Sequence, residues 1–167
     1  MSSLHSWFGN TVPENYSTTD HFLGNAYINL NQIIREIIQK YQVEKPDIQL
    51  VFRCEPLPFL EGGRQQVIEL FDKLIFLILK EASPSAKLFL YIDCAEEKVK
   101  SSSIKEVNKK YCIKFNTNIK ADDSWRNAND QFLIECDKIL SALKGTFAVR
   151  KINDTGCLFT LSLAGKL

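Results

Sequence analysis

Side chains that could carry out chemistry are few in this sequence of 167 residues. The two histidines, His5 and His21, lie in short, non-periodic surroundings near the N-terminus, where we interpret them as ordinary exposed residues. The five cysteines form no Cys-x-x-Cys pair and give no ligand spacing for zinc. The acidic pairs Glu96-Glu97 and Asp122-Asp123 lie in polar stretches and are interpreted as solvated surface. With no Gly-x-Ser-x-Gly elbow either, nothing supports a hydrolase, and we predict no metal site.

The charge of the chain is balanced, with 21 basic and 20 acidic residues and a net charge of +1. Because no face of one sign is indicated, we predict neither nucleic-acid binding nor attachment to a membrane. No apolar run reaches the roughly 18 residues that a membrane-spanning helix needs, and no signal peptide is indicated. Four of the five cysteines lie in or beside apolar runs, which is typical of small buried side chains in a reducing, cytoplasmic protein.

Hydrophobic periodicity divides the chain into a linker or arm at residues 1–26 and one domain at 27–167. Asn29 is positioned to cap the first helix, and Gln32 to complete a capping box. The stretch 117–129 is polar and irregular. The order of elements is typical of an α+β, two-layer sandwich, in which three helices cover one face of a mixed five-stranded sheet. The predicted helices are 30–41, 64–81 and 130–144, and the predicted strands are 48–54, 87–94, 110–116, 146–152 and 157–163.

Three stretches, in this order, resemble the catalytic, ATP-binding domain of sensor histidine kinases, which has a Bergerat-type fold. Residues 28–34 (INLNQII) are similar to the Asp-Leu-Asn opening of that family's first helix. Residues 56–71 (PLPFLEGGRQQVIELF) are similar to the approach to its second helix. Residues 136–163 are similar to its last helix and closing hairpin. The resemblance spans 28–163 and implies a histidine kinase ATPase-like fold.

The residues with which that family binds metal are replaced here. Its second helix presents an Asn that holds Mg²⁺, and the resemblance places Leu77 at that position and Lys73 at an Asn one turn earlier. Mg²⁺ requires oxygen ligands, which a leucine side chain does not offer. Lys80 alone matches the family's basic residue on this helix, and a helical lysine is more often a solvated surface charge.

The two glycine-containing boxes of that family are absent as well. Asn116 lies in the region of the box whose Asp reads the adenine. The box that cradles the phosphates falls at the start of the third helix, where Phe132 fills phosphate space and Asp130 repels phosphate charge. No glycine occurs between Gly63 and Gly145, so the close backbone approach that glycine permits is lost. The resemblance also implies that the mobile lid is shortened to residues 117–129.

The sequence therefore predicts a degenerate histidine kinase ATP-binding-like domain that acts as a signalling or protein-docking module in a two-component phosphorelay. We expect no catalytic residues, no metal and no cofactor. The expected partner is a histidine kinase dimerisation domain or a response regulator. Trp7, Phe8 and Trp125, the last of these in the shortened lid, are candidate contact residues. The alternative is that Trp7 and Phe8 dock on their own domain and that Trp125 packs onto the sheet. The vestigial nucleotide-site positions are Lys73, Leu77, Lys80, Asn116, Asp130 and Phe132.

The alternative hypothesis is a divergent but active sensor histidine kinase domain, which would bind ATP and Mg²⁺ and phosphorylate a histidine. The implied fold favours this alternative, whereas the replaced residues argue against it. Binding of Mg-ATP distinguishes the two.

Overall fold

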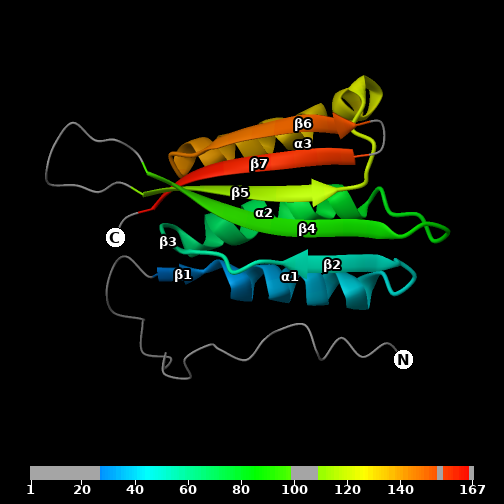
Figure 1. The fold of residues 1–167 in the computed structure, drawn as a ribbon, viewed down its shortest axis with the longest axis horizontal. Helices are drawn as coiled ribbons and strands as arrows, with labels where there is room; N and C mark the ends of the chain where they lie inside the picture. Colours follow the sequence, from blue (N-terminus) through cyan, green and yellow to red (C-terminus); the bar gives the residue numbers. More distant parts are fainter. Residues whose placement is uncertain (1–26, 99–108, 154–155, 166–167) are drawn as a thin grey trace, which may run out of the picture.

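A computed structural model describes residues 27–98, 109–153 and 156–165. The predicted arm, with His5, His21, Trp7 and Phe8, lies outside the described residues. In chain order the elements are β1 (Tyr27–Asn29), α1 (Leu30–Glu44), β2 (Leu50–Cys54), β3 (Phe59–Glu61), α2 (Arg64–Leu79), β4 (Leu88–Lys98), β5 (Lys109–Thr117), α3 (Asp123–Ala142), β6 (Thr146–Asn153) and β7 (Gly156–Gly165) (Figure 1).

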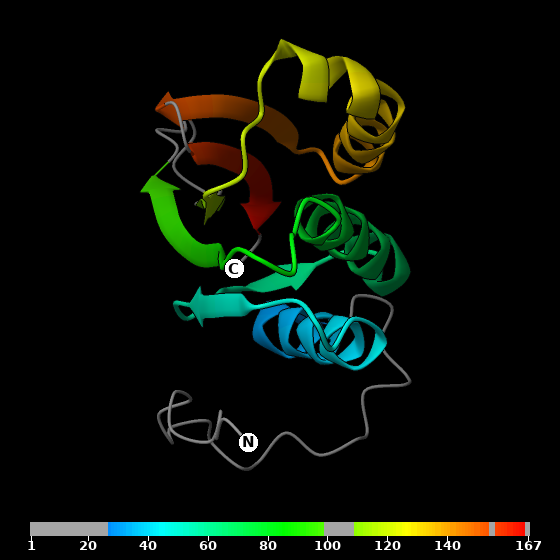
Figure 2. The same ribbon diagram turned by 90° about the vertical axis from the view of Figure 1, so that its right-hand side faces the viewer.

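Five of the strands form one mixed sheet in the order β2-β4-β5-β7-β6. β2 runs parallel to β4, while the other neighbouring pairs are antiparallel. Seen end-on, the three helices of the described residues lie together on one face of this sheet (Figure 2). The predicted α+β sandwich, with its mixed five-stranded sheet and helices on one side, is confirmed.

The first helix begins where the sequence predicts it. The Asn29 side chain accepts a hydrogen bond from the Gln32 backbone N–H at 3.3 Å, as an N-cap does. The Gln32 side chain donates to Glu36 instead of returning to Asn29, so the capping box is half formed. In the first turn of α1, the Asn31 side chain donates to the Leu57 carbonyl oxygen at 2.9 Å and accepts from the Leu57 N–H at 3.0 Å. These two bonds fix the β2–β3 connection on the helix.

The core lies between the sheet and α2, the middle helix of the layer. Apolar residues surround most of α2, as its wide apolar pattern predicts, and helices of this kind must be buried on several sides. Phe71 contacts Phe115 of the central strand β5 with ring centroids 5.8 Å apart. None of the helices in the described part of the chain is both long enough and apolar enough to cross a membrane.

Three sequence predictions need correction. The short strands β1 and β3 pair with each other and were not predicted, because three-residue strands flanked by a helix cap and by prolines leave no periodic signal. β4 ends at Lys98, four positions beyond the predicted residue 94, and in this extension Glu96 forms a cross-strand ion pair with Lys109 at 3.3 Å. The third helix begins at Asp123, seven positions before the predicted residue 130.

The early start of α3 has a local cause. The Asp122 side chain accepts a hydrogen bond from the Trp125 N–H at 2.8 Å and caps the helix. Trp125 and Asn129 follow at a spacing of four residues, so both lie on the buried face. A buried asparagine breaks the apolar pattern by which the sequence predicts a helix. The predicted irregular lid at 117–129 is therefore wrong, because its second half is helical.

The cysteines behave as small hydrophobic side chains. Cys112, Cys136 and Cys157 are buried, Cys54 and Cys94 are half-buried, and all five are free thiols. Burial raises the pKa of Cys136 to about 11 and that of Cys54 to about 12. Thiols held in this protonated form are poor nucleophiles. The structure thus supports a packing role.

We expect Asn31→Ala to lower the free energy of unfolding by about 1–3 kcal/mol, because it leaves a partly buried backbone N–H and carbonyl of Leu57 without partners. Chemical denaturation measures this loss. Gln39→Ala, at an exposed position on the same helix, is the matched control and should change stability by less than about 0.5 kcal/mol. Equal effects of the two substitutions would contradict the bridging role of Asn31.

Candidate functional site

The resemblance places the nucleotide site where the C-terminal half of α2, the end of β5 and the first half of α3 meet. Leu77, at the position of the metal-binding Asn, is fully buried. It belongs to the same apolar cluster as Phe115 of β5 and Trp125 of α3. Leucine offers no oxygen ligand to a metal ion, and the Leu77 side chain is surrounded by the hydrophobic core.

Phe132 of α3 lies against α2. Its ring stacks on that of Phe76 with centroids 5.7 Å apart and an interplanar angle of 24°. The ammonium groups of Lys73 and Lys80 lie 5.3 Å and 5.9 Å from the centroid of the Phe132 ring. Both distances are within the range of a cation–π interaction. Three of the predicted vestigial positions, Lys73, Lys80 and Phe132, therefore lie together, and both lysines contact the phenylalanine ring.

A second set of polar contacts joins the same two helices. Lys80 Nζ donates a hydrogen bond to the Asn129 side-chain oxygen, and the Asn129 amide donates to the Trp125 carbonyl oxygen at 2.7 Å. Asn129 is only 3% exposed, so this pairing satisfies a buried polar group that would otherwise destabilise the fold. Lys80 is thus more than the solvated surface charge that the sequence favours.

An ion pair lies on the other side of Phe132. Lys73 Nζ donates to Glu135 Oε2 at 2.8 Å. This hydrogen bond raises the pKa of Lys73 and lowers the pKa of Glu135. Both groups are therefore charged at neutral pH. The two α3 residues that bridge to α2, Asn129 and Glu135, lie three residues before and three residues after Phe132.

Trp125 packs against the sheet at β7. It is 7% exposed and meets the Phe159 ring edge-on, with centroids 5.9 Å apart and an interplanar angle of 72°. Ile119 and Ala121, in the connection from β5 to α3, are buried as well. The prediction that Trp125 is an exposed contact residue is wrong, because α3 begins early enough to turn its side chain into the core. The alternative, that Trp125 packs onto the sheet, is confirmed by its contact with Phe159 of β7.

Two predicted site positions lie away from this cluster. Asn116 alternates with the buried Phe115 and Thr117, so its side chain is on the sheet face opposite the helices, where it donates to Asp93 at 3.1 Å. Asp130 is exposed on α3. At this end of β5, Thr117 is the polar residue whose side chain lies on the helix side of the sheet. Its hydroxyl oxygen accepts a hydrogen bond from the Ile119 N–H at 3.4 Å.

Sequence reasoning missed Asn129, Glu135 and the inward position of Thr117. Two signals could have found Asn129 and Thr117, whereas no local pattern marks Glu135. Asp122 followed by Trp125 and Asn129 has the spacing of a capped helix with one buried face, and strict alternation along β5 assigns Thr117, not Asn116, to the helix side.

Little open space remains near the site. Within the described residues, a shallow hollow of about 270 Å³ lies beside it, between the end of α2 and the connection from β5 to α3. Pockets that bury a small ligand typically have about 300–1,000 Å³. No three acidic, histidine or cysteine side chains in this part of the chain gather into a group that could hold a metal ion. The hollow is lined by Glu81, Ala82, Ser83, Ala86, Lys87, Leu88, Asn118, Ile119 and Lys120.

Comparison with solved structures identifies the fold. The histidine kinase AdeS of Acinetobacter baumannii matches over 86% of this chain and 68% of its own, with 14% identity and a TM-score of 0.62. The nucleotide-free catalytic domain of the histidine kinase ThkA matches over 86% and 97%, with 14% identity and a TM-score of 0.61. The mycobacterial sensor histidine kinase MprB matches over 84% and 99%, with 9% identity and a TM-score of 0.61.

The fold is therefore that of a histidine kinase catalytic domain, as the sequence resemblance implies. No family model and no curated protein matches the sequence. At 9–14% identity the likeness of these three structures is one of fold, and the residues at the site decide what this chain does.

We expect Leu77→Asn, which restores the metal ligand of the resembled family, to lower the free energy of unfolding by about 3 kcal/mol or more, because it places an amide in fully apolar surroundings. Leu77→Met is the matched control and should cost less than about 1.5 kcal/mol. Urea denaturation compares the two. An asparagine tolerated as well as methionine would show that the position is open to a polar group or ligand.

Proposed function

We propose that this chain is a degenerate histidine kinase ATP-binding-like domain that acts by protein contact in a two-component phosphorelay, without binding ATP. One observation carries the proposal: side chains of α2 and α3 fill and bridge the place where a nucleotide would lie. Lys80 with Asn129, Lys73 with Glu135, and Phe76 with Phe132 make these bridges.

Opening the site would be unfavourable. A nucleotide entering between the helices would have to displace Phe132 and separate Lys80 from the buried Asn129. It would also expose Trp125, and exposure of one large apolar side chain costs about 1.5–3 kcal/mol. A triphosphate with Mg²⁺ would gain no carboxylate or amide ligand at Leu77 in return.

The alternative function is that of a divergent but active kinase, and the observation in its favour is the fold. A further solved structure of the same fold, full-length ShkA, is described as a complex with AMPPNP, with 12% identity and a TM-score of 0.58 over 87% of this chain and 32% of its own. That ligand belongs to ShkA. In this chain the metal-binding position and both glycine boxes are replaced, which favours the contact function. A dimerisation domain or a response regulator is the kind of partner that we propose.

We expect no saturable binding of Mg-ATP up to millimolar concentrations. Isothermal calorimetry and thermal unfolding both test this expectation, because a ligand present at 100 times its Kd stabilises the folded state by about 2.7 kcal/mol. A histidine kinase catalytic domain that binds nucleotide serves as the positive control. Saturation at micromolar nucleotide, with a matching rise in Tm, would favour the active kinase.

A further inference from the structure

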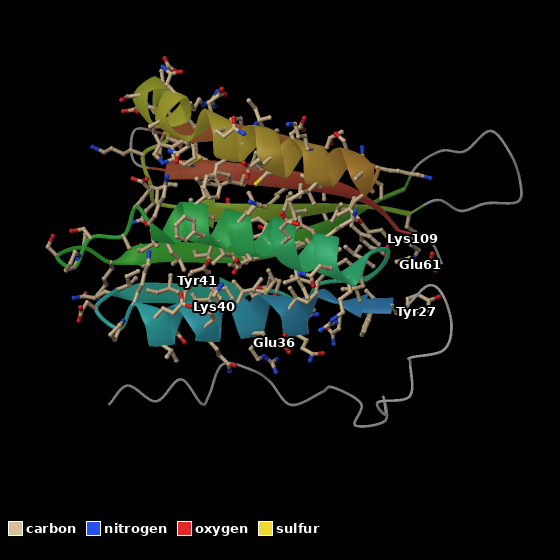
Figure 3. All side chains as sticks on the ribbon, turned by 180° about the vertical axis from the view of Figure 1, so that it is seen from behind. Tyr27, Glu36, Lys40, Tyr41, Glu61 and Lys109 are labelled. Carbon is tan, nitrogen blue, oxygen red and sulfur yellow. The ribbon has the colours of Figure 1, made fainter. Side chains whose placement is uncertain are left out.

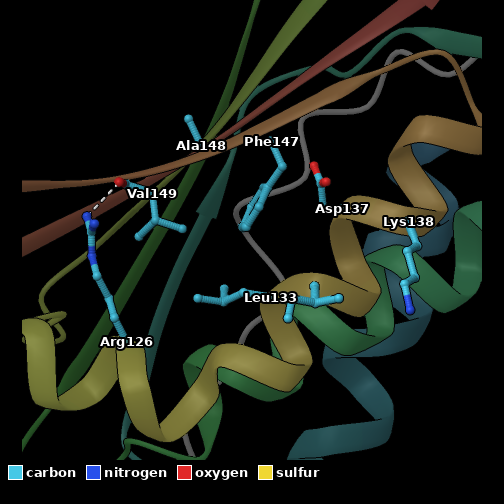
Figure 4. A pocket seen from close by; sticks show the side chains of 8 residues that line it. Arg126, Leu133, Asp137, Lys138, Phe147, Ala148 and Val149 are labelled. Atoms are coloured by element: carbon cyan, nitrogen blue, oxygen red, sulfur yellow. Dashed lines mark hydrogen bonds between the residues drawn. The ribbon is translucent and has the colours of Figure 1, made fainter.

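A groove lies between α3 and the edge of the sheet (Figure 4). It encloses about 450 Å³ and is separate from the filled nucleotide site. Its floor is apolar and comes from Leu133 of α3 and from Phe147 and Val149 of β6, all half-buried, while Ile134 at its side is 40% exposed. Apolar side chains left open in this way mark interaction sites when they gather in one place.

The strand beside the groove has an open edge. β6 is the last strand of the sheet, and β7 is the one strand of the described residues that pairs with it. The Val149 carbonyl oxygen accepts a hydrogen bond from Arg126 Nη2 of α3 at 2.8 Å, so here a side chain takes the place of a neighbouring strand (Figure 4). An edge of this kind can accept an added strand, whose alternate side chains would then point into the groove.

The charge around the groove is mainly positive. Arg126 and Lys138 flank it from α3, Arg150 and Lys151 extend along β6, and Asp137 is the acidic residue of the lining. An acidic segment is complementary to this edge. A second copy of the chain fits less well, because antiparallel pairing of two β6 strands would bring Arg150 and Lys151 of each copy close to those of the other.

From these observations we propose that an extended acidic segment of a partner protein adds to β6 as a sixth strand and places alternate apolar side chains in the groove. Its main chain would bond to the open edge of β6 and displace Arg126 from the Val149 carbonyl oxygen. Its acidic residues, which alternate with the apolar ones, would lie on the sheet face opposite the groove, beside Arg150. This inference rests on the proposed contact function and gives the partner a chemistry and a place on the fold.

The test uses the full chain and a labelled twelve-residue peptide of the repeat Glu-Val-Glu-Phe, measured by fluorescence anisotropy. We expect saturable binding, with backbone amide shifts concentrated at residues 146–153. Ile134→Asp should weaken binding at least tenfold. Val51→Asp is the matched control: Val51 is 44% exposed on β2, the opposite edge strand, and its replacement should leave binding unchanged.

Three results would overturn the proposal. The first is no saturable binding of the alternating acidic peptide. The second is equal binding of a peptide in which lysine replaces glutamate, or of one with the same composition and contiguous apolar residues. The third is a dimer of the chain joined through β6, seen by sedimentation and abolished by Ile134→Asp. If neither the peptide nor Mg-ATP binds, the inference about β6 is wrong but the proposed contact function stands. If Mg-ATP binds, the proposed contact function is wrong, whether or not the peptide binds.

Discussion

The contacts between α2 and α3 are the constraint on which the domain depends. α2 packs on the sheet in the middle of the helix layer, with α1 on one side and α3 on the other. Aromatic rings continue from Tyr41 of α1 to Phe76 of α2 and Phe132 of α3. Lys40 lies 4.7 Å from the centroid of the Tyr41 ring. Both of these residues belong to α1 (Figure 3). Because all these groups belong to the chain itself, the layer is complete without a ligand.

In the proposed function, closure of this layer accounts for the absence of ATP binding. In this chain Leu77, Phe132 and Trp125 pack in the region between α2 and α3. Phe132 also packs α3 against Phe76 of α2, and Trp125 packs it against Phe159 of β7. The opposite side of α3, with Leu133 and Ile134, faces the groove at β6. The proposed function therefore links the two sides of α3. The side facing α2 no longer binds nucleotide, and the other side offers a surface for protein contact.

The sequence predicted the architecture well because its signals there are strong. The Asn29 cap, the apolar faces of α1 and α2 and the alternation in the strands each agree with the fold. The site was harder to predict. Asn129 is polar yet buried, so the start of α3 was missed, and a one-residue shift along β5 put Asn116 in place of Thr117. Lys80 and Asn129 are separated by 49 positions in the sequence, and Lys73 and Glu135 by 62. Pairs so far apart leave no local pattern from which they could be predicted.

The central claim is that the region between α2 and α3 is closed in the absence of ligand. Amide hydrogen exchange along residues 123–136, with and without Mg-ATP, tests it most directly, because exchange reports local opening. A closed region predicts strong protection of these amides without nucleotide and no change when Mg-ATP is added. Rapid exchange that slows on addition of Mg-ATP would contradict the claim, since it would show a mobile site that a nucleotide orders.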